Sequence, residues 1–433
     1  MNAVTRLARR AVPTPLFYGW NIALAGAASN FLILGTVSFG FGVFIQPMRA
    51  EMGWSLAAIS LGFSLRSFEQ GLLAPVSGFL VDWLGPRRMA LTGVVVTASG
   101  LLIFSQAHDI RVYYLASLTI ALGQSVGAYT SFSAALMNWF NQKRGRAMGL
   151  LNAGNGGGYM MAPVLAVLIG TLGWRETLVI ASVTILYLGI PLALLLHDRP
   201  EPYGYLPDGE RLGGASTVAA PAARQVAPAS MSGMSVADAL RTPAFYLLAI
   251  STAAFGATLS AWIVHQIPHL QNVGFSLQTA ALIGGIYGLF QIGLRIVSGW
   301  LADIVGRRRL YVASFLLQGL GMLIFANLTA SRVWLLPFYY LTFALGHAIW
   351  VVLQQTMVAD YFGTRRFATL RGLSSTLQMP FGVVSPFLAG WMFDLTGSYQ
   401  LIFTIYAAVT ATGTLWVLLV RRPMWADVAA AQR

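Results

Sequence analysis

Three charged side chains lie deep inside long apolar segments, and they are the residues of this chain best placed to do chemistry. Arg66 and Glu69 share one segment, and Arg295 lies in another. Residues three apart face the same side of a helix, so Arg66 and Glu69 are able to pair. Two interpretations stay open for them. They form a structural clamp or outer gate, or Glu69 is a proton-coupling carboxyl that Arg66 modulates.

Arg295 differs from this pair because no acidic residue lies one helical turn away. Gln291 lies one turn above it on the same face, and Asp303 follows about 12 Å farther along the helix. One interpretation is that Arg295 extends to the membrane surface or binds backbone carbonyls. The other is that Arg295 is a counter-charge for an anionic ligand, because a forked guanidinium matches the geometry of a carboxylate.

The composition excludes an ordinary soluble globule, a coiled coil and a disordered chain. Of 433 residues, 57% are hydrophobic and 9% are charged, whereas a soluble domain has about 25% charged residues. The absence of cysteine excludes disulfides, thiolate metal sites and cysteine nucleophiles. The apolar runs are long and lack strict alternation, which favours membrane-spanning helices over a β-barrel. We expect twelve such helices, at about 17–47, 55–81, 89–107, 112–140, 146–171, 175–196, 243–270, 277–302, 310–328, 333–359, 370–393 and 399–420.

The segments divide into two halves around a linker that is rich in Pro, Gly, Ala and Ser. With both termini cytoplasmic, most of the 27 Lys and Arg residues fall in cytoplasmic loops, which fits the positive-inside rule. The net charge of +13 therefore indicates orientation, and we expect no nucleic-acid partner. The expected parts are a cytoplasmic arm (1–16), a six-helix bundle (17–196), a cytoplasmic linker (197–241), a second six-helix bundle (242–420) and a cytoplasmic tail (421–433).

A short motif follows the second segment and recurs after the eighth at matching spacing, which indicates that the halves are copies of one unit. In it, a glycine permits close helix packing, an aspartate ends the helix and a second glycine permits a tight turn. The arginines after it are able to bind the aspartate or the carbonyls at a neighbouring helix end. The two copies comprise Gly78, Asp82, Gly85, Arg87 and Arg88, and Gly299, Asp303, Gly306, Arg307 and Arg308.

At these motifs the chain resembles a transporter of the major facilitator superfamily, over essentially its whole length. The resemblance implies an all-α integral membrane protein, with twelve transmembrane helices in two pseudo-repeated six-helix bundles around a central cavity. It also implies alternating access by rocking of one half against the other. The first copy departs from the commonest pattern at Trp83 and Pro86.

An arginine in the eighth helix resembles the oxalate/formate antiporter and monocarboxylate porter branch of this superfamily. The stretch Glu201-Pro-Tyr-Gly-Tyr-Leu-Pro-Asp-Gly209 resembles the same branch. The oxalate type also carries a lysine in the eleventh helix, whereas the only basic residue of 370–393 is Arg371, at the inner end. One unpaired deep cation, Arg295, therefore favours a monocarboxylate over a dicarboxylate.

Polar residues on the seventh and tenth helices are further candidates, because these helices line the cavity in the superfamily that the chain resembles. A polar stripe on the seventh includes Trp262 and His265, and the tenth carries His347 and Gln354 seven residues apart. His347 is a candidate ligand or proton carrier, because imidazole titrates near neutrality. The alternative interpretation is that His347 forms hydrogen bonds that connect neighbouring helices. The remaining candidate ligands are Tyr129 and Asn30, for which packing is the alternative.

These features favour a secondary active transporter of small organic anions, monocarboxylates, by proton symport or anion exchange. Efflux of lipophilic drug-like solutes and a membrane solute sensor without transport are the alternatives. We expect no enzyme activity, no cofactor and no metal site. The expected setting is a multi-pass monomer in the plasma membrane, a bacterial inner membrane, with a small organic anion, the bilayer and protons as partners.

Overall fold

The computed structural model describes residues 17–141, 143–209, 234–363 and 366–420. The predicted arm and tail and the middle of the linker lie outside the described residues. Some side chains within the helices are also outside the description, namely those of Ala74, Pro75, Asp82, Ala128, Asp303, Gln355, Phe367 and Ala368.

The first half consists of six helical spans, three of which are interrupted. A π-helical turn interrupts the first span, Gly127 breaks the fourth, and a 3-10 turn interrupts the fifth. In chain order the elements are α2 (Gly19–Leu34), η1 (Gly35–Phe39) and α3 (Gly42–Met52); α4 (Leu56–Leu84); α5 (Pro86–Ser105); α6 (Ile110–Val126) and α7 (Ala128–Trp139); α8 (Arg144–Gly157), η2 (Gly158–Met160) and α9 (Met161–Leu172); and α10 (Trp174–Leu194).

The second half repeats this plan, with the tenth span as its interrupted helix. The described part of the linker contributes η3 (Glu201–Tyr203), η4 (Pro207–Gly209) and the short helix α11 (Val236–Leu240). The spans are α12 (Pro243–Asn272); α13 (Leu277–Val305); α14 (Arg307–Ala326); η5 (Ala330–Leu335), α15 (Leu336–Tyr339), η6 (Tyr340–Ala344) and α16 (Leu345–Phe362); α17 (Phe367–Thr396); and α18 (Gln400–Leu419).

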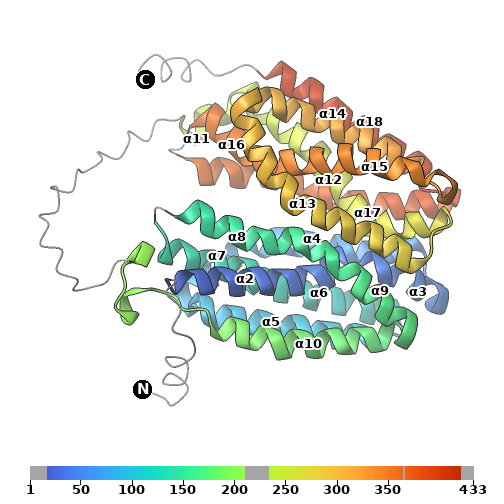
Figure 1. Cartoon of the computed structure of the whole chain (residues 1–433), viewed down its shortest axis with the longest axis horizontal. Helices are drawn as coiled ribbons and strands as arrows, with labels where there is room; N and C mark the ends of the chain where they lie inside the picture. The colour runs from blue at the N-terminus through green and yellow to red at the C-terminus, as the bar shows by residue number, and fades with distance from the viewer. Residues whose placement is uncertain (1–16, 142, 210–233, 364–365, 421–433) are drawn as a thin grey trace, which may run out of the picture.

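Nine helices in the described ranges are long and apolar enough to cross a membrane. The spans α4, α6 with α7, and α17 complete the predicted twelve. Figure 1 shows the two halves as two layers, blue to green and yellow to red. We call the end that holds the α4–α5 and α13–α14 turns the linker end, because α10 also ends there and α12 begins there. The opposite end is called the far end.

The two copies of the motif adopt the same turn, as their matching sequences predict. Gly85 has φ 86° and ψ 145°, and Gly306 has φ 92° and ψ 133°. Glycine accepts this positive φ without steric cost. The next helix begins immediately after each turn, with Pro86 at the first position of α5, where its missing N–H removes no helical bond.

The halves pack closely at the far end and separate toward the linker end. The space around individual glycines shows this difference. A side chain built on Gly390 of α17 would collide with Leu56 of α4, and one on Gly288 of α13 would collide with Tyr159. At the linker end the described residues leave Gly78 and Gly299 without a neighbour within 4 Å. The close packing expected at these two motif glycines is therefore absent in this conformation.

The apolar cores follow the same division. One core runs through the first half and continues into the far end of the second, where α12, α13 and α18 contribute to it. A separate core fills the linker end of the second half. Among the described residues, the apolar core that joins the halves lies at the far end, and the ribbons of the two layers are farther apart at the linker end (Figure 1).

Candidate functional site

Arg295 lies on α13 where that helix meets α8 of the other half. A Cβ built on Gly156 would lie 3.8 Å from Nη1 of Arg295, so the guanidinium faces the opposite half directly. Its Nε donates a long hydrogen bond of 3.4 Å to Oε1 of Gln291. Arg295 forms no ion pair with any carboxylate that the structure describes. A partly buried cation thus lies between the halves, and its guanidinium has further N–H donors available to a ligand.

Gln291 connects Arg295 to a buried polar chain. Its Nε2 donates to the Tyr287 hydroxyl at 3.1 Å and to the Ala344 carbonyl at 2.9 Å, while the Tyr287 hydroxyl hydrogen-bonds Nδ1 of His347. Gln291, Tyr287 and His347 are each at most 3% exposed. Because both donors of the Gln291 amide are satisfied, its oxygen is held toward Arg295 and fixes that side of the guanidinium.

Gln291 and His347, the two predicted members of this hydrogen-bonded chain, both depend on an irregular turn in the tenth span. The π-helical turn η6 ends at Ala344, and the carbonyl of that residue is one acceptor for Gln291. Single π-helical turns are frequent at functional sites, because they redirect backbone groups. Here the turn offers a backbone acceptor to α13 just before α16, the helix that carries His347.

A cluster of aromatic rings lies between Arg295 and the far end. Tyr287 packs against Trp262 at 4.6 Å and against Tyr159 of the first half at 5.2 Å between ring centroids. Trp262 also contacts Phe343 at 4.8 Å. All four rings are at most 2% exposed. They form an apolar barrier that closes the site toward the far end.

Polar contacts join the halves beyond this barrier. Oδ1 and Oδ2 of Asp394 on α17 accept hydrogen bonds from the backbone N–H groups of Leu56 and Ala57, at 3.0 and 2.8 Å. Arg49 of α3 lies 3.8 Å from the same carboxylate. Free N–H groups and a partial positive charge at a helix N-terminus favour such a carboxylate. We call this set of contacts the far-end latch.

The predicted pairing of Arg66 with Glu69 does not form in this structure. Nη1 of Arg66 donates instead to the Val37 carbonyl at 2.8 Å, and its guanidinium lies 4.5 Å from the Phe41 ring centroid. Val37 belongs to the π-helical turn η1, which offers its carbonyl to α4. Oε2 of Glu69 is buried without a hydrogen-bond partner. In this conformation a backbone acceptor takes the place of the carboxylate, and the choice between a clamp or gate and a proton-coupling role stays a prediction.

The other candidate ligands lie in four different places. Trp262 belongs to the aromatic barrier, where its ring contacts those of Tyr287 and Phe343. His265 lies at the far end, where Nε2 is 2.8 Å from the Pro386 carbonyl and 3.2 Å from Oγ of Ser60. Asn30 is fully buried in α2, and neither of its amide atoms has a partner. The final two candidates, Gln354 and Tyr129, lie nearer the linker end.

The motif arginines have different partners in the two halves. Arg307 pairs with Asp360 at 2.8 Å. In the first half Asp198, after α10, accepts a hydrogen bond from the Arg87 backbone N–H at 3.0 Å. The side chains of the motif aspartates, Asp82 and Asp303, lie outside the description. Their proposed pairing with the arginines thus stays a prediction.

Sequence reasoning missed Tyr287, Tyr159 and Asp394. Tyr287 is four residues before Gln291 and eight before Arg295, so helical spacing on α13 is a signal able to find it. Tyr159 and Asp394 come from other elements and meet the site or the latch only after the halves have packed. No spacing within one helix indicates such contacts.

Two pseudo-repeated helical bundles with a polar site between them are the architecture of a polytopic membrane transporter. The chain belongs to the Major Facilitator Superfamily, whose family profile matches residues 27–268 and 246–431. Members of this family are transporters, which confirms both the predicted family and the expectation that the chain is no enzyme. The protein is therefore a multi-pass membrane protein.

Curated relatives support the predicted branch. Monocarboxylate transporter 13 of Rattus norvegicus is 26% identical over 411 residues, which cover 94% of this chain and 90% of the relative. Monocarboxylate transporter 12-B of Danio rerio is 26% identical over 427 residues, with 94% and 88% covered. The predicted resemblance to the monocarboxylate porter branch is confirmed.

Solved structures confirm the fold. A crystal structure of the nucleoside transporter NupG matches with a TM-score of 0.72 at 14% identity, over 93% of this chain and 99% of that one. A bacterial homologue of the human lysosomal transporter Spinster, in an inward-facing and occupied conformation, matches with a TM-score of 0.67 at 16% identity, over 95% of each chain. At these identities the likeness concerns the fold alone, and it confirms the predicted twelve helices in two bundles.

Proposed function

We propose that the protein is a secondary active transporter of small monocarboxylates, with Arg295 as the residue that binds the carboxylate. The observation that carries the proposal is a partly buried guanidinium between the halves that has Gln291 as its described partner and no acid. A charged side chain at this depth costs at least about 2.5–3.5 kcal/mol without compensation. A bound anion supplies that compensation, and a transporter leaves the place open for it.

The surroundings of Arg295 favour one carboxylate rather than two. Gly156 of α8 faces Arg295 from the opposite half, and a Cβ built on it would also lie 3.7 Å from Ile292. The side chains of Gln291, Tyr287 and His347 are bonded to one another, and none of them is a second arginine or lysine. The names of the relatives agree with a monocarboxylate.

Alternating access follows from the two ends of the molecule. In this conformation the aromatic barrier and the far-end latch close one end, while Gly78 and Gly299 at the linker end have no described neighbour within 4 Å. Rocking of one half against the other breaks the latch and brings Gly78 and Gly299 into contact with the opposite half. The motif then has the packing role that its glycines indicate.

Energy coupling is assigned to proton symport or anion exchange. Glu69 supports symport, because its buried Oε2 has no hydrogen-bond partner and its predicted ion pair does not form. His347 is the second proton-carrier candidate, since its Nδ1 is bonded to the Tyr287 hydroxyl within the Arg295 chain. An intramembrane ionisable residue of this kind marks a functional site by default.

The positive-inside bias orients the linker end toward the cytoplasm, with both termini on that side. The structure described here is then the inward-open state of a monomer in the plasma membrane, a bacterial inner membrane. Its partners are a small organic anion, the surrounding lipid and, for symport, protons.

Uptake into liposomes tests the proposal. Purified protein is reconstituted, and uptake of labelled lactate, pyruvate and acetate is measured for the wild type, Arg295→Ala and Arg309→Ala. Arg309 is the matched control, because it is exposed at the linker end and lies far from the site. We expect saturable uptake that only Arg295→Ala abolishes. Stimulation by an acidic exterior indicates symport, and stimulation by internal carboxylate alone indicates exchange. Equal uptake by Arg295→Ala, or transport of lipophilic cations instead of carboxylates, contradicts the proposal.

A further inference from the structure

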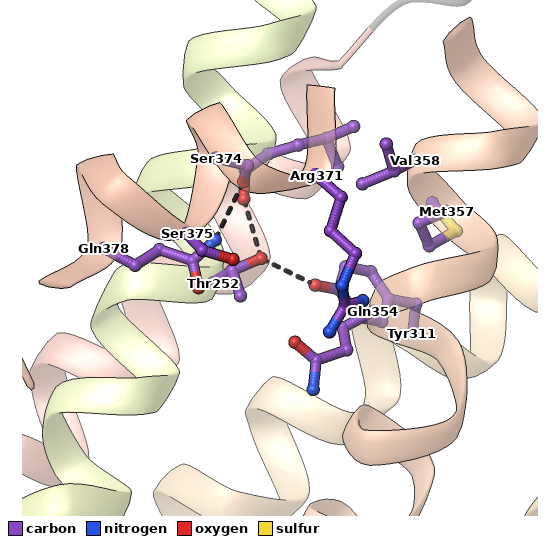
Figure 2. Close-up of a pocket in the computed structure, with 10 residues that line it drawn as sticks. Thr252, Tyr311, Gln354, Met357, Val358, Arg371, Ser374, Ser375 and Gln378 are labelled. Carbon is purple, nitrogen blue, oxygen red and sulfur yellow. Dashed lines mark hydrogen bonds between the residues drawn. The ribbon is translucent and has the colours of Figure 1, made fainter. Parts of the chain in front are cut away.

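A second polar pocket lies within the second half, nearer the linker end than Arg295. It is enclosed by α12, α14, α16 and α17 (Figure 2). Its polar lining consists of Thr252, Tyr311, Gln354, Arg371, Ser374 and Gln378, with Ser375 at its edge. The function proposed above makes no use of this pocket.

Arg371 is the charged group of the pocket and has no described ion pair or hydrogen bond. Its side chain is partly buried, and Figure 2 shows the guanidinium extending into the pocket toward Gln354 and Tyr311. The amide of Gln354 and the hydroxyl of Ser375 also have no described hydrogen-bond partner. Three groups able to donate to one anion therefore border the same small space.

The remaining polar groups are already bonded and form the frame of the pocket. Oγ1 of Thr252 donates to the Leu248 carbonyl at 2.8 Å and lies 3.0 Å from the Tyr311 hydroxyl. Nε2 of Gln378 donates to Oγ of Ser374 at 2.8 Å. These bonds hold α12, α14 and α17 in register around the space that Arg371 enters.

The pocket lies beside the route from Arg295 to the linker end. Arg295 is ten residues before the end of α13, which is about 15 Å, and Arg371 is four residues after the start of α17, which is about 6 Å. Tyr129 of α7, in the other half, is 38% exposed and near enough to Arg371 for the two groups to interact electrostatically. Arg371 therefore faces the space between the halves as well as the pocket.

The size of the pocket limits what enters it. Its cavity volume is about 20 Å³, and a single water needs roughly 10–15 Å³ on this measure. A polar group of about that size fits, whereas a whole organic anion does not. The carboxylate end of a ligand is thus the part that the pocket takes, while the rest of the ligand stays between the halves.

We propose that this pocket is a second carboxylate-binding station, in which Arg371, Gln354 and Ser375 hold the anion between the Arg295 site and the linker end. The proposal rests on the proposed function, because it assigns a further place on the path of the same substrate. The station collects the anion at the linker end and transfers it to or from Arg295.

The absence of native cysteine permits a direct test at Ser375. Ser375→Cys places a thiol at the pocket edge, and Ser331→Cys, exposed at the far end, is the matched control. Purified protein is treated with an anionic sulfonate and a cationic trimethylammonium methanethiosulfonate reagent. We expect the anionic reagent to be favoured about tenfold at position 375 relative to position 331, because a local cation raises the encounter rate of an anion.

Arg371→Gln is expected to remove this preference, and Arg371→Lys is expected to keep it. Lactate is expected to slow modification of the 375 thiol when Arg371 is present, including in an Arg295→Gln background, and to give no protection with Arg371→Gln. Retention of a single elution peak on size exclusion shows that each variant is folded. If Arg371→Gln does not fold, the anion preference of Arg371→Lys and the protection by lactate in Arg295→Gln still test the proposal.

The outcomes separate this inference from the proposed function. Arg295-dependent lactate binding without protection of the 375 thiol overturns the second station and leaves the proposed function standing. An anion preference that survives Arg371→Gln also overturns it. Protection of the 375 thiol by lactate in the Arg295→Gln protein supports the station, even if that protein no longer transports. Protection by chloride equal to that by lactate assigns the pocket to inorganic anions and contradicts the proposal.

Discussion

Substitution of Asp394 by Asn is expected to release the far-end latch. Asp394 belongs to the second half, and its carboxylate accepts two backbone hydrogen bonds from the start of α4 in the first half, at 3.0 and 2.8 Å. Asparagine preserves the shape of the side chain but removes the charge and one acceptor oxygen. The contact between the halves is therefore weakened without a change in either bundle.

The magnitude follows from these contacts. A carboxylate at a helix N-terminus contributes about 0.3–1 kcal/mol when exposed and up to about 2 kcal/mol when partly buried. The Asp394 side chain is 20% exposed, which places it nearer the upper value. Arg49, 3.8 Å away and 35% exposed, adds at most about 1 kcal/mol. We expect Asp394→Asn to cost the closed far end about 1.5–2 kcal/mol, which raises the ratio of open to closed molecules roughly 10- to 30-fold.

Distance measurements across the far end test this prediction. Spin labels on Gln106→Cys and Ser331→Cys, one in each half, report the far-end separation by pulsed electron resonance. Asp109→Asn is the matched control, because Asp109 caps α6 within its own half, with 2.9 Å from Oδ1 to the Arg111 N–H. Asp394→Asn is expected to add a long-distance population that Asp109→Asn does not. Identical distance distributions for Asp394→Asn and the wild type refute the latch.

Three further substitutions test other parts of the account. Gln291→Leu removes the acceptor that orients Arg295 and leaves Ala344 without its bond, so carboxylate affinity is expected to fall about three- to tenfold by calorimetric titration, with an unchanged fold by circular dichroism. Glu69→Gln is expected to abolish proton-driven accumulation in liposomes while sparing carboxylate exchange; accumulation against a gradient by this variant rules Glu69 out as the proton carrier. Burial lowers the pKa of the His197 imidazole, which packs edge-on against Tyr18 and Tyr203 after α10. Because its unfolded pKa is about 6.5, neutral His197 stabilises the fold above that pH, and this contribution is lost as the pH falls through the lower folded pKa. Wild-type thermal stability should therefore decline more than that of His197→Gln below about pH 6.5, and parallel declines contradict the assignment.

The sequence predicts the fold well because the bilayer imposes strong constraints on it. Apolar runs long enough to span a membrane predict the helices, and the repeated motif predicts the two-half plan and the matching turns at Gly85 and Gly306. The irregular turns η1 and η6 were not predicted. A π-helical turn depends on packing and on acceptors from other helices, which hydropathy does not encode.

The site is only partly predictable for the same reason. Arg295 and Gln291 share one helix face, so spacing alone predicts that they are neighbours. Spacing also predicts that Arg66 pairs with Glu69. This ion pair is not formed here, because the guanidinium contacts the Val37 carbonyl and the Phe41 ring instead. Local spacing identifies possible partners, and tertiary packing decides among them.

The central claim is that Arg295 binds the carboxylate of the substrate, and titration of lactate into purified protein tests it most directly. A hydrogen bond to a charged group is worth about 1.5–3 kcal/mol, so Arg295→Ala is expected to weaken binding at least about tenfold. Arg295→Lys should recover part of the loss, because an ammonium lacks the two-pronged contact, and Arg309→Ala should bind like the wild type. Equal affinities for the wild type and Arg295→Ala, or tighter binding of neutral and cationic solutes than of lactate by the wild type, would contradict the claim.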